Sequence, residues 1–284
     1  MSRFAVAGLQ LALNNQNNID EIVKEVGAVK KRFPWVQMIV VGELALFGPS
    51  TDNAVRTDHE VFAVLAATAR DNAVWLIPGS LFVAEGQRVY NVTPVFNPEG
   101  VEVTSYRKIF PFTPYEKGVT PGAECCVFDV PDVGRFGVSI CYDMWFPEVS
   151  RTLAWMGAEV IIHPTMTNTI DRDVEVSLVR ANAVSNQVYF IDINVAGRLG
   201  NGRSVVAGPG GEIIHEAGEV REIIAVELDL AYLRRCRERG WQNLGQVLKS
   251  WRDCDVNFPP YSEGVKNSAS LQSLGELVVP KTEK

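Results

Sequence analysis

Residues 137–148 read GVSICYDMWFPE and place a cysteine between an apolar run and the start of a helix. The run that ends at Ile140 predicts a buried strand, and Pro147 is typical of the first position of a helix. Cys141 therefore lies at a strand end, where the following backbone N–H groups can donate to an oxyanion. The alternative is a buried thiol with a purely structural role. A nucleophilic role needs the thiolate form, and therefore a base and a cation that come from elsewhere in the chain.

Composition limits the possible functions. The chain has 284 residues, of which 46% are hydrophobic and 21% are charged, as expected for one large globular domain. A net charge of −7 without a basic stretch excludes nucleic acid as a partner. No apolar run approaches membrane-spanning length, so no membrane partner is expected. The five cysteines lack C-x-x-C spacing and indicate a reducing compartment, with the cytoplasm as the expected location.

Short β-branched runs alternate with helical segments along the chain, which predicts an α/β fold with helices covering the sheets. Helices are expected at 18–32, 58–72, 147–157 and 172–187. Strands are expected at 4–11, 36–44, 73–82, 125–130, 134–140, 159–165, 188–197, 204–216 and 221–230, with a hairpin over 88–109 that turns at 97–100. No interdomain linker is found, and the segment after Trp251 is expected to form an arm.

Several titratable residues end apolar strands. Glu43 closes MIVVGE, and Lys108 follows VTSYR. Either residue alone is typical of a chain leaving the core for water, but strand ends of α/β sheets converge on one rim, where sites form. His163 ends the strand after the cysteine's helix and is positioned to line such a site, whereas His59 and His215 suit structural roles. A papain-like Cys–His pair has no local support, and neither His nor Cys residues show metal-ligand spacing.

These residues carry a resemblance to the nitrilase superfamily of carbon–nitrogen hydrolases, which runs from the first strand to about Asp229. Its motifs are Glu43 in VVGELALFG, Lys108 in YRKIFPF, Glu116 in PYEKGVTPG and Cys141 in GVSICYDMWFPE. The resemblance implies a single-domain, four-layer α-β-β-α sandwich over residues 1–235. It also implies a homodimer or a higher oligomer, with the helix at 147–157 near the twofold axis and residues 236–284 as an arm that packs on the partner.

The resemblance also implies a mechanism. Glu43 would be the general base, and Cys141 the nucleophile that forms a thioester. Lys108 and the backbone N–H of Tyr142 would stabilise the oxyanion, while Glu116 would hold Lys108 and the substrate nitrogen. No cofactor and no metal are expected. An ammonium facing a thiol lowers the pKa of the thiol, whereas two nearby carboxylates oppose its full conversion to thiolate. A proton then stays available for exchange between the thiol and a carboxylate.

The chain departs from the family pattern at two places, and the second of them bears on the substrate. Ser185 stands where the later helix often carries a glutamate, usually a structural one. Tyr142 and Asp143 follow the cysteine where true nitrilases usually carry Trp and Glu; Asp143 itself fits the commoner role of a helix cap. N-carbamoyl-D-amino-acid hydrolases place two arginines where Met144 and Trp145 stand, so that carboxylate clamp is absent here.

The predicted function is hydrolysis of a non-peptide C–N bond in a small linear amide, releasing ammonia or an amine. An N-carbamoyl-amine amidohydrolase is the alternative, because DMWFPE is similar to the motif of N-carbamoylputrescine amidohydrolases. A nitrilase, or a non-catalytic protein of the same fold that binds a partner, is less favoured. The residues expected to contact substrate are Tyr142, Trp145, His163, Thr165 and Met166, with Asn168 a further candidate by position.

Overall fold

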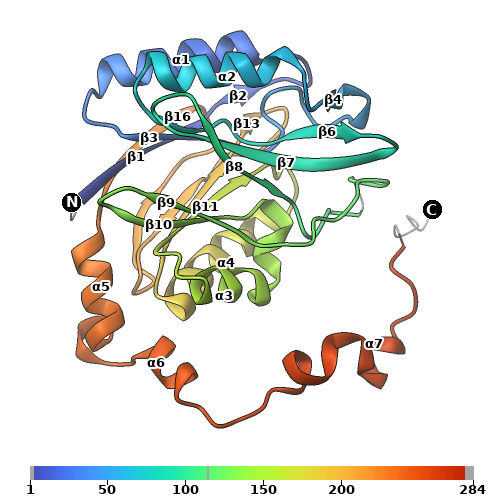
Figure 1. Cartoon of the computed structure of the whole chain (residues 1–284), viewed down its shortest axis with the longest axis vertical. Coiled ribbons are helices and arrows are strands. Elements are labelled where there is room, and N and C mark those ends of the chain that lie inside the picture. Colours follow the sequence, from blue (N-terminus) through green and yellow to red (C-terminus); the bar gives the residue numbers. More distant parts are fainter. Residues whose placement is uncertain (1–2, 114, 279–284) are drawn as a thin grey trace.

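Two β-sheets lie face to face, and a pair of helices covers the outer side of each (Figure 1). The computed structural model describes residues 3–113 and 115–278. The order of layers is helices, sheet, sheet, helices, which confirms the expected α-β-β-α sandwich.

The first sheet has a parallel centre with antiparallel strands at its sides. Its strands β1, β3 and β5 pair in parallel, while β16 and β7 pair antiparallel to β1 and β5. In order across the sheet the strands are β16 (Glu222–Asp229), β1 (Arg3–Gln10), β3 (Met38–Val41), β5 (Trp75–Ile77), β7 (Arg88–Phe96), β6 (Leu81–Glu85) and β4 (Val55–Arg56), with β8 (Glu102–Arg107) on β7.

The second sheet is built in the same way, with β10, β11 and β12 parallel at its centre. In order its strands are β15 (Ile213–Glu216), β14 (Val205–Ala207), β12 (Tyr189–Asn194), β11 (Val160–Thr165), β10 (Gly134–Val138) and β9 (Cys126–Val130). A short pair, β2 (Ala12–Leu13) and β13 (Ala196–Gly197), lies beside the two main sheets.

Three apolar cores separate the four layers. Helices α1 (Ile19–Arg32) and α2 (Glu60–Asp71) cover the first sheet, and α1 buries Ile22, Val26 and Val29 at the spacing of one helical face. Helices α3 (Pro147–Trp155) and α4 (Asp171–Asn186) cover the second sheet. Between the sheets, aromatic rings interlock: Phe4 lies 5.3 Å from Phe136, centroid to centroid.

Three expected strands are divided in the structure. Residues 73–82 form β5 and β6, because Pro78 and Gly79 turn the chain between them. Gly79 has φ +83°, and a Cβ there would lie 1.8 Å from the carbonyl oxygen of Gly42, so only glycine fits. Residues 204–216 form the hairpin β14–β15, and 188–197 form β12 and β13. The hairpin over 88–109 is confirmed as β7 and β8.

The C-terminal part leaves the body only after two further helices. The expected boundary between 235 and 236 falls inside α5 (Leu230–Arg239), whose Leu233 and Cys236 are buried against the body. Helix α6 (Val247–Arg252) packs beside α4, and Trp251 lies under the guanidinium of Arg151. Beyond it the chain runs away from the sandwich to α7 (Ala269–Gln272) (Figure 1).

The remaining elements are short. They are the 3₁₀ turns Thr51–Asn53, Cys141–Trp145, Trp241–Asn243 and Val265–Asn267, and the π turn Pro260–Gly264. In the described part of the chain, every helix falls short of the length and apolar character that crossing a membrane requires.

Candidate active site

Cys141 occupies a strained position directly after the strand β10. It begins the 3₁₀ turn Cys141–Trp145 with φ +46°, in the left-handed region that non-glycine residues avoid at a cost of roughly 1 kcal/mol. Its side chain is 7% exposed and lines a cavity. Strained backbone of this kind clusters at functional sites and persists only when the surroundings enforce it.

The carboxylate of Asp143 enforces this turn. Its Oδ2 accepts hydrogen bonds from the backbone N of Ile140 at 2.9 Å and from the hydroxyl of Tyr106 at 2.7 Å. Its Oδ1 accepts from the backbone N of Phe110 at 2.9 Å. Asp143 is therefore not the cap of α3, a position held by Phe146; it ties the cysteine turn to the segment that follows Lys108. Burial raises the pKa of Asp143 to about 6, although Lys108 opposes this shift.

Lys108 lies between two buried carboxylates. Its Nζ is 2.8 Å from Oε1 of Glu43 and 2.5 Å from Oε2 of Glu116. All three side chains are almost fully buried. Burial lowers the pKa of Lys108, but the charges of Glu116 and Glu43 outweigh burial and hold the pKa well above its ordinary value. The ammonium therefore stays charged, because losing its proton would leave two buried carboxylates unpaired.

Glu43 and Cys141 have pKa values suited to proton exchange. Burial raises the pKa of Glu43 to about 7, with Lys108 opposing and Glu116 adding to the shift. Burial and the charge of Glu43 raise the pKa of Cys141 well above its ordinary value. The lowering expected from Lys108 is present, but burial outweighs it. The resting pair is therefore a neutral thiol beside a carboxyl group that titrates near neutral pH, as a general base requires.

Asn91, on β7, completes this group and was not expected from the sequence. Its Nδ2 donates to Oε1 of Glu43 at 2.9 Å and to Oε1 of Glu116 at 2.7 Å. The only signal in the sequence is a polar side chain within the apolar strand RVYNVTPVF. Asn91 fixes the separation of the two carboxylates.

Backbone contacts hold Glu43 against the second sheet. The amide N of Glu43 donates to the carbonyl O of Thr165, at the end of β11, at 3.1 Å. The amide N of the next residue, Leu44, donates to Oγ of Ser80 at 3.0 Å. Glu43, which follows β3 of the first sheet, is thus anchored at the end of β11 in the second sheet, the sheet that also carries Cys141.

These groups open into a cavity of about 440 Å³. Of the residues expected to contact substrate, Tyr142, Trp145, Met166 and Asn168 line it. The full lining is Glu43, Leu44, Pro49, Lys108, Phe112, Tyr115, Glu116, Cys141, Tyr142, Trp145, Met166, Thr167, Asn168, Thr169, Asp171, Glu175 and Leu199.

His163 and Thr165 do not line the cavity, contrary to expectation. Alternate side chains of β11 point to opposite faces, and both residues share the face of Ile161, which packs toward α3 and α4. Nδ1 of His163 lies 2.7 Å from Oγ of Ser139, and Thr165 donates to Oδ1 of Asp192 at 2.6 Å. Burial lowers the pKa of His163 to about 4, so its imidazole is neutral near neutral pH.

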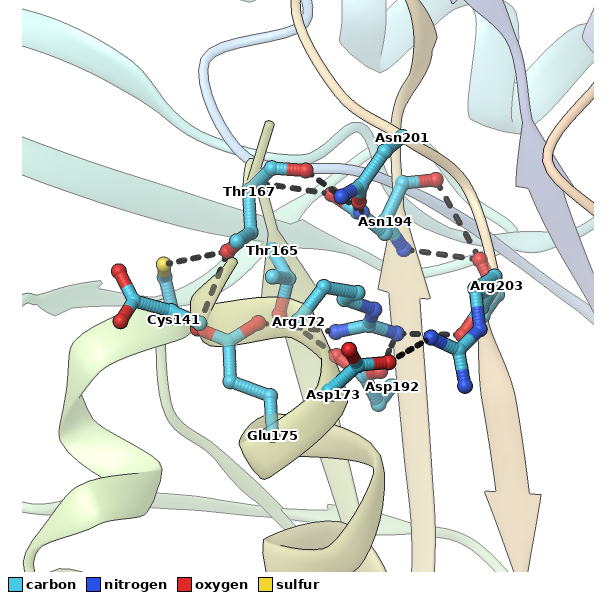
Figure 2. Close-up of polar contacts among 12 residues, drawn as sticks. Cys141, Thr165, Thr167, Arg172, Asp173, Glu175, Asp192, Asn194, Asn201 and Arg203 are labelled. Carbon is cyan, nitrogen blue, oxygen red and sulfur yellow. Dashed lines mark hydrogen bonds and ion pairs between the residues drawn. The ribbon is translucent and has the colours of Figure 1, made fainter. Parts of the chain in front are cut away.

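A second buried network, which includes Thr167, Glu175, Arg172 and Asp192, also reaches the thiol (Figure 2). Oγ1 of Thr167 lies 3.8 Å from Sγ of Cys141 and donates to Oε1 of Glu175 at 3.0 Å. Glu175 pairs with Arg172 at 3.1 Å, and Arg172 also pairs with Asp192. Nothing in the sequence marks the members of this network, because they are ordinary polar residues of a helix, a strand and a strand end.

The other cysteines lie outside the cavity lining. Cys125, Cys126, Cys236 and Cys254 are all free, and burial raises the pKa of Cys125 to about 11. Ser185, the departure noted in the later helix, is half-buried on α4 and outside the cavity lining; its Oγ donates to the carbonyl of Ala181 at 2.7 Å and accepts from Nδ2 of Asn186 at 3.4 Å. This departure therefore leaves the site unchanged.

Known proteins resemble this chain over most of its length. The family model for carbon–nitrogen hydrolases matches residues 3–238. The omega-amidase NIT2 of Pongo abelii is 30% identical over 259 residues, which cover 84% of this chain and 93% of that protein. Saccharomyces cerevisiae Nit3, a member of branch 10 of the nitrilase superfamily, has a TM-score of 0.77 and 30% identity, over 84% of this chain and 94% of that one.

A mutant of the amidase from Nesterenkonia sp. AN1, solved with butyramide, has a TM-score of 0.73 and 26% identity, over 83% of this chain and 94% of that one. The match of the family model covers most of the chain, including all four motif residues. The chain therefore belongs to the carbon–nitrogen hydrolase family of the nitrilase superfamily, and it is an enzyme of the amidase type.

Proposed function

We propose that this enzyme hydrolyses the C–N bond of a small linear amide through a thioester on Cys141. The observation that carries the proposal is the buried Lys108 ammonium held between Glu43 and Glu116, in a cavity that the Cys141 thiol also lines. Related proteins named omega-amidases, and an amidase solved with butyramide, support an amide as substrate.

In the first half-reaction, Glu43 takes the proton of the Cys141 thiol as sulfur attacks the carbonyl carbon. The carbonyl π electrons move to oxygen, and the oxyanion accepts hydrogen bonds from Nζ of Lys108 and the backbone N–H of Tyr142. Tyr142 lies in the first turn of a 3₁₀ segment, where backbone N–H groups lack partners within the helix. The intermediate then collapses, the nitrogen leaves with the proton held by Glu43, and an acyl thioester remains.

In the second half-reaction, Glu43 takes a proton from water while the water oxygen attacks the thioester carbon. Collapse of this second intermediate releases the carboxylic acid and returns the proton to the sulfur. Glu116 keeps Lys108 in place throughout, because its Oε2 also accepts from the backbone N of Phe112 at 2.6 Å.

Ammonia release from a linear amide, an N-carbamoyl amine and a nitrile tests this function. We expect the amide or the carbamoyl amine to be hydrolysed faster than the nitrile. Lys108→Met should lower kcat by about 10²-fold or more, the usual cost of losing one oxyanion donor. Glu43→Gln, which removes the general base, should cost about 10²-fold or more as well, and Cys141→Ala should abolish turnover because it removes the nucleophile. Lys117→Met is the matched control, since Lys117 is exposed and lies outside the cavity lining. Full activity in Lys108→Met would refute the mechanism.

The C-terminal arm supports a proposal about assembly. Apart from Ser268, residues 252–278 are exposed, and they include Phe258, Tyr261, Leu271 and Leu274. Apolar surface of this extent marks a contact site, and a second copy of the chain is the occupant that we propose. The enzyme would then be a homodimer or a multiple of one.

The five free cysteines fit the reducing cytoplasm as its location.

A further inference from the structure

The walls of the active-site cavity carry an excess of negative charge. Four carboxylate side chains line it, from Glu43, Glu116, Asp171 and Glu175, against the single cation Lys108 among the described lining residues. Both Glu43 and Glu116 already hold Lys108. No cation on the described walls is therefore left for a carboxylate group of a substrate.

The nearby arginines do not change this balance. Arg172 is 1% exposed and lies behind the wall, where it contacts Glu175, Asp192 and the carbonyl of Arg203. One guanidinium shared by two carboxylates leaves that group with one net negative charge when both are ionised. Glu175 is the carboxylate of this group that reaches the cavity. Arg198 lines a separate hollow that shares only Asn168 with the cavity.

Glu175 and Asp171 bring two of the four carboxylates to the cavity from one helix, α4. They are four residues apart on α4, so their side chains lie on the same face of the helix. Glu175 is linked to Sγ of Cys141 through one hydroxyl, that of Thr167, by contacts of 3.0 and 3.8 Å. Asp171 is less buried than Glu175 and accepts from Oγ1 of Thr169 at 2.8 Å.

Aromatic side chains make up much of the remaining wall. Phe112, Tyr115, Tyr142 and Trp145 all line the cavity. Aromatic faces attract cations such as ammonium groups, and carboxylates inside a partly desolvated cavity strengthen that preference.

We propose that the cavity selects amides that carry an ammonium group at the end remote from the scissile bond, and that Glu175 and Asp171 set this preference. This inference rests on the proposed amide hydrolysis and specifies its substrate class. A carboxylate at the same place would face Glu175 and Asp171 without a cation to pair with.

Three amides of matched length test it: 4-aminobutanamide, pentanamide and glutaramate, which end in an ammonium, a methyl and a carboxylate. We expect kcat/KM to fall in that order, by about tenfold or more at each step, the ratio that ~1.4 kcal/mol supplies. Glu175→Gln and Asp171→Asn should lower the ratio of kcat/KM between 4-aminobutanamide and pentanamide by at least about threefold each. A purely structural role would lower both rates equally and leave the ratio unchanged.

Asp173→Asn is the matched control. It removes the same charge from the same helix, but Asp173 is exposed, pairs with Arg203 and lies outside the cavity lining, so the ratio should not change. Calorimetric binding of the three amides to Cys141→Ala separates the two claims. Binding without charge preference, or tighter binding of glutaramate, overturns the inference even if amides are hydrolysed. Preferential binding of 4-aminobutanamide without turnover by the wild type overturns the proposed function instead.

Discussion

Nδ2 of Asn91 donates to Oε1 of Glu43 across 2.9 Å, and the same nitrogen lies 2.7 Å from Oε1 of Glu116. One amide group thus bridges two carboxylates that would otherwise repel each other. Nζ of Lys108 also donates to both carboxylates, so two fixed donors lie between Glu43 and Glu116. Asn91 lies outside the family's catalytic motifs, and we expect it to influence the pKa of Glu43, because a donor to a carboxylate favours the ionised form.

Asn91→Asp should move the acid limb of the pH–rate profile upward. The new carboxylate replaces a donor with a third negative charge, which raises the pKa of Glu43 by about one unit or more. At pH 7 a rise of one unit lowers the ionised fraction of Glu43 from about one half to about one eleventh, so kcat/KM should fall by about fivefold or more. The measurement is kcat/KM against pH for Asn91→Asp and the wild type.

Thr93→Val is the control for this change, because Thr93 lies two residues further along β7 and its buried hydroxyl has no hydrogen-bond partner in the described structure. Its profile should match the wild type. An acid limb that stays in place in Asn91→Asp would contradict the role assigned to Asn91.

The wild-type profile itself should report Glu43. The base must be ionised to accept the thiol proton, and its pKa is raised from an ordinary value of 4.5 to about 7. The kcat/KM for a neutral amide should therefore be near its maximum above pH 8 and fall about tenfold per pH unit below pH 6. A rate that stays constant down to pH 5 would exclude Glu43 as the titrating base.

Alkylation should distinguish Cys141 from the other thiols. Cys254 is exposed, so iodoacetamide will also react there, and the test is best made in Cys254→Ser. In that background, loss of activity should parallel carboxamidomethylation of Cys141, and an amide substrate should slow both. Peptide mass spectrometry against residual activity gives the correlation. Inactivation that parallels modification of Cys126 would refute the assignment.

The arm should control assembly. Removing residues 253–284 keeps α5 and α6, which contact the body, and deletes the segment that carries Phe258, Tyr261 and Leu274. Light scattering should show a dimer or larger assembly for the full chain and a smaller species after truncation, with lower activity. A fully active full-length monomer at micromolar concentration would refute the proposed assembly.

Much of the fold could be predicted from the sequence, because the alternation of apolar and polar residues is clear in elements that have one face exposed to solvent. The apolar spacing of 18–32 predicted α1 to within one residue, and the turn at 97–100 predicted the β7–β8 hairpin. The segments 73–82 and 204–216 were predicted as single strands although Pro78-Gly79 and the Gly-Pro-Gly-Gly run at 208–211 are turn signals. At Gly79 the structure adds the tertiary reason for the turn, a close approach to the carbonyl oxygen of Gly42.

The alternation of strands and helices can be read from local patterns, and the motifs alone point to Glu43, Lys108, Glu116 and Cys141 as one group. The orientation of His163 and Thr165 cannot, because strand alternation defines two faces without saying which of them forms the site. In the folded chain both residues lie outside the cavity lining. The tertiary structure alone added Asn91, Thr167 and Glu175, which come from different elements and meet only in the folded chain. It also decided the pKa of Glu43, since burial and the distances to Lys108 and Glu116 are properties of three-dimensional packing.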